Sequence, residues 1–88
     1  MDILHNAQQA FRNRDFSQAE MLLLQALQND PDNAMILLRL GQVYMAQGNF
    51  EQSFDVLRQS QKNDPLDPDV YRSIGMSIRM SGLIDLGI

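Results

Sequence analysis

Apolar residues recur along the chain at spacings of three and four, which is the pattern of helices with one buried face. In the central part, Leu37, Leu40 and Tyr44 fall on one helical face, and a second apolar stripe follows through Phe50 and Leu57. A glycine followed by an asparagine interrupts the pattern between the two stripes. Because such residues favour turns, the pattern predicts two helices joined by a short turn.

The pattern repeats along the chain at one fixed interval, which is the separation of Phe16 from Phe50. Asp30-Pro31 and Asp64-Pro65 recur at the same interval. A fixed interval of this length predicts stacked helix pairs that share a continuous core. The other matches are Gln18 with Gln52, Ala19 with Ser53, Leu23 with Leu57, Ala26 with Ser60, Leu40-Gly41 with Ile74-Gly75, and Gly48 with Gly82.

Capping residues indicate where the predicted helices begin and end. Residues 15–18 and 49–52 have the spacing of a capping box, with Asp15 and Asn49 as the side chains that accept from backbone N–H groups. Asp64-Pro65 is expected to end a helix, since the residue before proline avoids helical dihedral angles.

Small residues recur at positions where the helices are expected to pack closely. These residues are Ala19, Gly41, Ser53 and Gly75. A larger side chain at any of them would force the packed helices apart.

The residues that match at this interval form a known pattern. In the first unit they are Ala7, Ala10, Phe16, Ala19, Leu23, Ala26 and Pro31, and in the second Leu40-Gly41, Tyr44, Gly48, Phe50, Ser53, Leu57, Ser60 and Pro65. The pattern resembles the tetratricopeptide repeat, whose units are antiparallel helix pairs of about 34 residues. The resemblance covers the whole chain, although serine stands for the usual alanine at two positions and the first unit lacks the usual Leu-Gly pair.

This resemblance implies an all-α solenoid of about two and a half repeats within one domain. Repeat 1 is expected over residues 1–33 and repeat 2 over residues 34–67. A partial repeat 3 is expected over residues 68–88, with a first helix from Pro68 to Ser81, because proline suits the first turn of a helix.

An apolar stub, residues 82–88, follows this last helix, and three interpretations of it stay open. The sequence stops inside a third repeat, which leaves an apolar edge uncovered. Alternatively, a second copy covers that edge and forms a homodimer, because three repeats are usually needed for independent stability. In the third interpretation the last helix caps the array and the stub is disordered.

Composition excludes several classes of function. Seven Lys and Arg residues against eleven Asp and Glu residues give a net charge of −4, which does not suit nucleic-acid binding. No signal peptide is visible, and apolar runs such as residues 21–24 are far shorter than a membrane span of roughly 20 residues. We therefore expect a cytoplasmic protein without membrane insertion, and the absence of cysteine agrees with a reducing compartment.

The sequence contains no constellation of residues for catalysis. His5 is the single histidine, and the glycines follow the repeat instead of forming a phosphate-binding loop. The acidic groups at residues 30–32 and 64–69 lack the ligand spacing of a calcium loop, so turns and helix caps explain them better. We predict that the protein is not an enzyme and binds neither cofactor nor metal.

In tetratricopeptide repeats the first helix of each unit lines a concave groove that binds a peptide or helix, so the resemblance implies a groove here. Four of the seven basic residues fall in it, whereas Asp69 is its one acid. Arginine pairs with carboxylates and methionine adapts to apolar side chains, so the expected ligand carries apolar and acidic residues. The groove residues are Leu4, Gln8, Phe11, Arg12, Met35, Leu38, Arg39, Gln42, Met45, Arg72, Met76 and Arg79, with His5, Asp69, Ser73 and Met80 beside them.

The binding of a C-terminal carboxylate, as in chaperone-binding members, is not expected. Among the corresponding positions only Arg39 fits, and Asp69 would repel the carboxylate. The sequence thus predicts a scaffold or adaptor for another polypeptide. The alternatives are a self-associating structural unit and a non-catalytic fragment of a larger protein.

Overall fold

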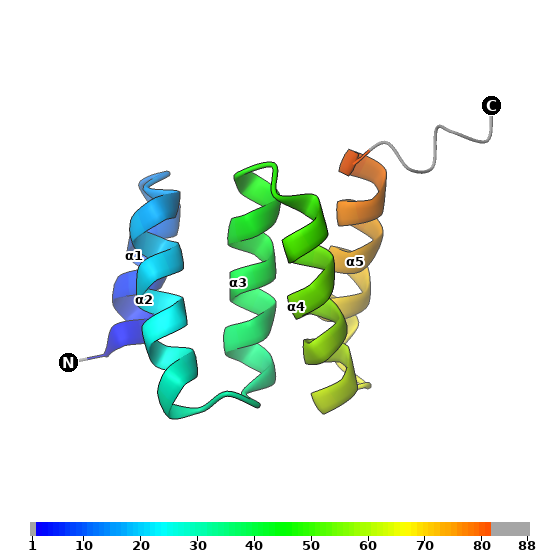
Figure 1. Ribbon diagram of the computed structural model, residues 1–88, viewed down its shortest axis with the longest axis horizontal. Coiled ribbons are helices and arrows are strands. Elements are labelled where there is room, and N and C mark those ends of the chain that lie inside the picture. The colour runs from blue at the N-terminus through cyan, green and yellow to red at the C-terminus, as the bar shows by residue number, and fades with distance from the viewer. Residues whose placement is uncertain (1, 82–88) are drawn as a thin grey trace.

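The computed structural model describes residues 2–81, which form five α-helices and no strand. The helices stand in a row in chain order (Figure 1), and they confirm the prediction of an all-α fold. None of these five helices combines the length and the apolar character needed to cross a membrane. The predicted stub, residues 82–88, lies outside the described residues. The helices are α1 (Ile3–Arg12), α2 (Phe16–Asn29), α3 (Ala34–Ala46), α4 (Phe50–Asn63) and α5 (Pro68–Ser81).

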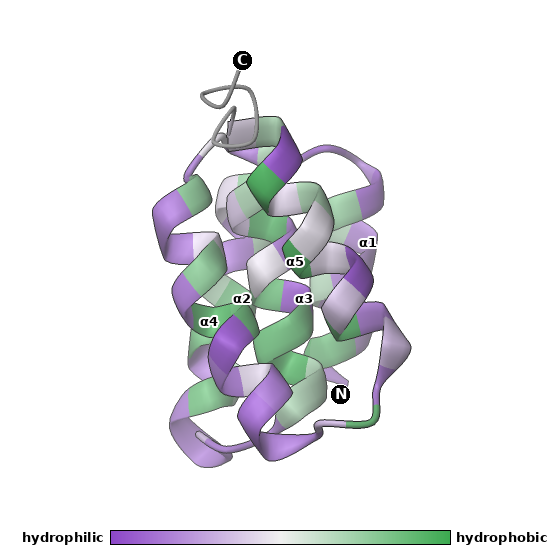
Figure 2. Cartoon of the chain, turned by 90° about the vertical axis from the view of Figure 1, so that its right-hand side faces the viewer, coloured by the Kyte–Doolittle hydropathy of each residue, from purple (hydrophilic) through white to green (hydrophobic). Residues whose placement is uncertain are grey.

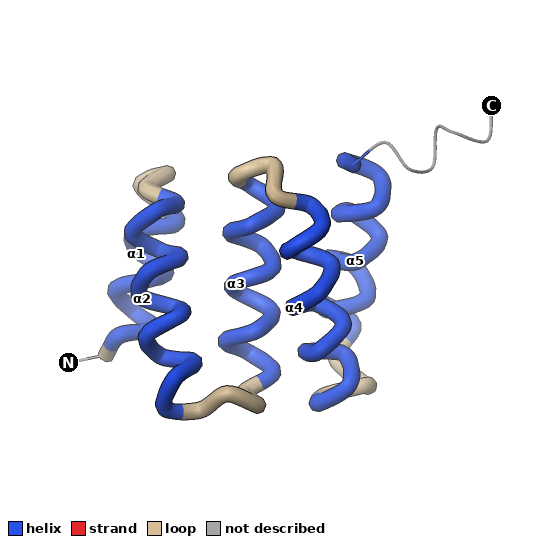
Figure 3. The backbone as a smooth tube through the Cα atoms, in the orientation of Figure 1, coloured by secondary structure: helices blue, strands red, loops and turns tan. Residues whose placement is uncertain are grey.

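The helices pack in two layers. Each helix contacts the next along the chain, and short loops at alternating ends make consecutive helices antiparallel (Figure 3). In addition, α3 contacts α5. Viewed along the row, α2 and α4 lie on one side, and α1 lies on the other (Figure 2). The odd-numbered helices therefore share one face of the molecule.

The turn inside each helix pair has the same hydrogen bonds in both repeats. The N–H of Asp15 donates to the carbonyl of Ala10 at 2.8 Å, and at the equivalent place in the second repeat the N–H of Asn49 donates to the carbonyl of Tyr44 at 2.8 Å. This bond belongs to a helix C-terminus that ends with a left-handed residue. Gly48 fills that position with φ 81°, whereas the first turn places Arg14 there with φ 63°.

Of the two predicted helix caps, the one at Asp15 is confirmed and the one at Asn49 is wrong. The Asp15 carboxylate accepts from the N–H of Gln18 at 3.3 Å, as expected of a cap. The Asn49 side chain makes no capping bond, and its amide nitrogen donates to the side-chain oxygen of Gln47 at 3.4 Å. Asn33, which was not predicted as a cap, accepts with its side-chain oxygen from two N–H groups at the start of α3.

The apolar core runs through the helix stack in two clusters. The larger cluster lies between α1, α2 and α3, and the smaller joins Leu38, Leu57 and Val70 of α3, α4 and α5. Two buried hydroxyls bind α4 to α3, since Ser53 donates to the carbonyl of Gly41 at 2.8 Å and Ser60 to that of Ala34 at 2.7 Å. The two serines thus add hydrogen bonds that the usual alanines would lack.

The two glycines predicted at close helix contacts differ in their surroundings. A Cβ atom on Gly41 would lie 2.5 Å from Cγ of Leu57, so α4 approaches α3 as expected. A Cβ atom on Gly75 would meet nothing within 4 Å in the described part of the chain. The described residues place no helix against α5 at the position where α4 covers α3, so the close contact expected at Gly75 stays a prediction.

Candidate binding surface

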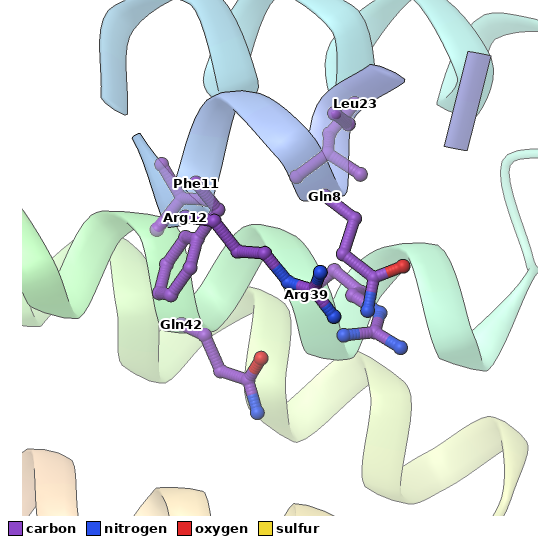
Figure 4. Close-up of a pocket in the computed structure, with 8 residues that line it drawn as sticks. Gln8, Phe11, Arg12, Leu23, Arg39 and Gln42 are labelled. Carbon is purple, nitrogen blue, oxygen red and sulfur yellow. The ribbon is translucent and has the colours of Figure 1, made fainter. Parts of the chain in front are cut away.

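A pocket of about 130 Å³ opens between α1 and α3 on the face that the odd-numbered helices share. We call it the first hollow. Its floor is apolar and comes from one buried residue on each of three helices, Ala7, Leu23 and Val43. The remaining lining residues surround this floor and are shown with it in Figure 4. They are Gln8, Phe11, Arg12, Arg39 and Gln42.

A wider pocket of about 460 Å³ lies next to it, between α3 and α5, and we call it the second hollow. Three methionines give it a flexible apolar surface, and two of them, Met76 and Met80, are about half exposed. Its lining residues are Phe11, Gln42, Met45, Ala46, Asp69, Arg72, Ser73, Met76 and Met80. Because Phe11 and Gln42 line both pockets, the two hollows are neighbours on one surface.

The second hollow occupies in the next repeat the place that the first hollow has in the repeat before. A shift by one repeat carries five lining positions of the first onto lining positions of the second. The backbone therefore builds the same depression twice, with different side chains. The pairs are Gln8 with Gln42, Phe11 with Met45, Arg12 with Ala46, Arg39 with Ser73, and Gln42 with Met76.

Phe11 forms the wall between the two hollows. Its ring meets the ring of Phe16 edge to face, with 5.4 Å between centroids and an angle of 68° between the ring planes. This geometry is favourable for two aromatic rings. Because Phe16 packs against the core at the start of α2, the wall rests on a side chain that is held in place.

The charges on this surface are unevenly distributed. Neither α1 nor α3 contains an acidic residue, whereas each contributes one arginine to the first hollow, Arg12 and Arg39. Among residues 2–81 these two arginines form no ion pair. In the second hollow Arg72 lies 3.7 Å from Asp69, with both side chains mostly exposed. Such an exposed pair contributes little to stability, so Arg72 remains accessible to a ligand.

Most predicted groove residues gather at the hollows, but four do not line either of them. Leu38 is only 8 % exposed and packs with Leu57 and Val70, so it belongs to the core. Leu4 packs against the larger core cluster. Met35 and Arg79 are exposed elsewhere on the odd-numbered helices. The residues at the hollows are Gln8, Phe11, Arg12, Arg39, Gln42, Met45, Arg72 and Met76.

The groove residues predicted from the sequence do not include the floor of the first hollow or Ala46 of the second. Ala7 and Leu23 belong to the repeat pattern, which predicts core positions. The side chains of a pocket floor also belong to the core. The repeat pattern alone therefore does not distinguish a core residue that lines a pocket from one that does not. Ala46 follows Met45 in α3 and carries only a methyl group, which leaves no chemical signal for ligand binding.

A titratable group in the core, away from both hollows, has a shifted pKa. Burial, followed by the negative charge of Glu20, raises the pKa of Tyr44 above its ordinary value of 10.0. The Glu20 carboxylate accepts a hydrogen bond of 3.0 Å from the side-chain amide of Gln47. This bond joins α2 to the C-terminal end of α3, so the Glu20 carboxylate has a structural role.

Comparison with known proteins agrees with this architecture. A sequence model of the tetratricopeptide repeat family matches residues 10–75, which is three quarters of the chain. No curated protein matches the sequence. The matched range covers the end of α1 and all of α2, α3 and α4, together with the first half of α5. The family is typically non-catalytic and generally mediates interactions between proteins. With its helix pairs repeated at a fixed interval and its match across most of the stack, the chain belongs to the tetratricopeptide repeat family.

Proposed function

We propose that the protein is a scaffold or adaptor whose two hollows bind a peptide or helix carrying apolar and acidic residues. The observation that supports this function most directly is the face shared by α1, α3 and α5. It combines two apolar depressions with three arginines, Arg12, Arg39 and Arg72, and a single acid on their linings. A protein of net charge −4 thus presents a locally basic surface to an acidic partner.

The test begins with a partner identified by pull-down, whose affinity is then measured by calorimetry. The double variant Arg39→Glu and Arg72→Glu places one negative charge at each hollow. It is expected to weaken binding at least about tenfold, since like charges across an interface cost several kcal/mol. Circular dichroism should show unchanged helicity, because Arg39 is only half-buried and Arg72 is exposed.

Arg58→Glu is the matched control, since this exposed arginine lies on α4 and lines neither hollow. It changes the net charge in the same direction without touching the surface proposed for binding. Equal affinity of the wild type and the double variant, with helicity retained, would contradict the proposed function.

A second candidate is self-association through the open face of α5. It is supported by the contrast between Gly41, which Leu57 covers, and Gly75, whose Cβ position is open in the described residues. Light scattering over a range of concentrations tests it. A homodimer is expected to show a mass that rises with concentration, whereas a strict monomer would exclude this candidate.

A further inference from the structure

We propose that the first hollow binds one aliphatic side chain of the ligand, while Arg12 and Arg39 together bind the carboxylate of an acidic residue beside it. The inference rests on the proposed function and deepens it, because it assigns the two kinds of ligand residue to one place. The partner is an acidic peptide segment of another protein with leucine, isoleucine or valine next to aspartate or glutamate.

The size and lining of the first hollow suit one aliphatic side chain. A volume of about 130 Å³ is close to that of engineered apolar cavities of ~150 Å³, which hold a molecule as large as benzene. A single branched aliphatic side chain fits this space. The floor residues Ala7, Leu23 and Val43 carry no polar side-chain atom, so an apolar group loses no hydrogen bond when it leaves water.

The two arginines at this hollow have no acidic partner within reach on their own helices. The sequence of α1 and that of α3 contain no Asp or Glu. Asp2, just before α1, accepts a hydrogen bond from the N–H of Leu4 as the helix cap. On α2 the Glu20 carboxylate is bound by Gln47. Figure 4 shows the Arg12 side chain extending from α1 toward the part of the hollow where Arg39 and Gln8 end.

Two guanidinium groups at one pocket repel each other unless an anion lies between them. A carboxylate has two oxygens and accepts paired hydrogen bonds from arginine, so it suits this position better than a neutral group. The adjacent apolar floor favours a carboxylate attached to a peptide over a free inorganic anion. The overall charge of −4 disfavours a nucleic acid as the source of the anion.

The second hollow provides an internal comparison. It has the same position in its repeat as the first hollow, but Ala46 stands where Arg12 stands and Ser73 where Arg39 stands. The second hollow has one arginine, Arg72, which lies 3.7 Å from the carboxylate of Asp69. A pair of arginines without an acidic neighbour should therefore belong to the first hollow alone, and the stronger preference for a carboxylate with it. The glutamines Gln8 and Gln42 occur at equivalent positions of both, where their amides suit the backbone of a ligand in either hollow.

The experiment is a titration of the ¹⁵N-labelled protein, followed by NMR, with the capped peptide acetyl-Gly-Ser-Leu-Asp-Ser-Gly-amide. Two companion peptides replace its aspartate by asparagine or its leucine by alanine. Amide signals of Gln8, Gln42 and Val43 are expected to shift most. Each companion should bind at least about fivefold more weakly, because it lacks either the charge-assisted bonds or the apolar group. Raising the salt from about 0.05 M to about 0.5 M should weaken the aspartate peptide and leave the asparagine peptide almost unchanged.

The double variant Arg12→Gln and Arg39→Gln should bind the aspartate and asparagine peptides equally. The control Arg58→Gln should preserve the preference for aspartate. Equal binding of the two peptides by the wild type would overturn the inference. So would the largest shifts at Met45 and Met76, or the absence of shifts with all three peptides. The proposed function fails by a different result, namely a natural partner whose affinity does not respond to charge reversal at Arg39 and Arg72.

Discussion

Replacing each of two equivalent glycines by alanine compares a covered helix face with an open one. In α3, a Cβ atom on Gly41 would lie 2.5 Å from Cγ and 2.6 Å from Cδ2 of Leu57. Leu57 is completely buried and packs against Leu38 and Val70, so it has little room to move. Overpacking of this kind costs about 1–3 kcal/mol, whereas alanine in place of glycine favours a helix by about 1 kcal/mol. We expect Gly41→Ala to lower the free energy of unfolding by about 1 kcal/mol.

Gly75→Ala should have the opposite sign. Since the described residues place nothing within 4 Å of its Cβ position, only the gain in helix propensity remains. The free energy of unfolding should rise by about 1 kcal/mol. In a domain of this size, a difference of about 2 kcal/mol between the two variants separates their melting temperatures by about 10 °C.

The assay is urea denaturation followed by circular dichroism, at several protein concentrations. If Gly75→Ala destabilises the protein as Gly41→Ala does, the face of α5 is covered and our reasoning about this position is refuted. A loss that appears only at high concentration would identify the cover as a second copy of the chain and would support self-association.

Four further substitutions each change a single side chain. Arg14→Gly should raise the free energy of unfolding by about 0.5–1 kcal/mol in urea denaturation, because φ 63° suits glycine better than arginine; an unchanged midpoint would contradict it. Ser77→Ala should raise that free energy by up to about 1 kcal/mol, since the buried Ser77 hydroxyl has no hydrogen-bond partner within residues 2–81. Ser53→Ala, which loses a bond of 2.8 Å, should lower it by about the same amount, and equal effects of the two would refute this interpretation. Because the pKa of Tyr44 is raised on folding, the unfolded chain releases its proton first, so this stability is complete below about pH 10 and is lost as the pH rises through the folded pKa. Urea midpoints measured against pH should therefore fall more steeply above about pH 10 for the wild type than for Tyr44→Phe.

The fold was predictable because the repeat interval and the apolar stripes both indicate where each helix begins and ends. Each turn between α1 and α2, or between α3 and α4, lies where the stripe breaks, and Pro68 begins α5 as expected. The absence of a cap at Asn49 was not predictable, because the side-chain orientation that caps the helix and the one that reaches the neighbouring Gln47 differ little in free energy. The boundaries proposed for the repeats stay predictions.

The hollows were predictable in part. Helical register places Gln8, Phe11 and Arg12 on one face, and the repeat carries this face to Arg39 and Gln42. Register alone does not say how far α5 leans over α3, and this packing decides that Leu38 is buried while Arg39, its neighbour in the chain, lines a pocket.

At one site the repeat alone does not decide the packing. It places Gly75 in the position of Gly41, and the prediction of close packing assumed that a helix covers both glycines. Equivalent positions in two repeats predict the same backbone conformation. They do not predict the same neighbouring side chain on the facing helix. That neighbour belongs to a different helix, and each helix needs its own evidence.

The two hollows have one shape and unlike chemistry, and this difference gives the surface a direction. A peptide that spans both meets Arg12 and Arg39 at one end, and three methionines with the pair of Arg72 and Asp69 at the other. A peptide bound in the opposite direction would bring its carboxylate to a hollow whose one arginine already lies beside Asp69, and would leave Arg12 and Arg39 next to its aliphatic side chain. An asymmetric ligand should therefore lie along the stack in one orientation, so the part of the partner that continues beyond each end of the groove is also determined.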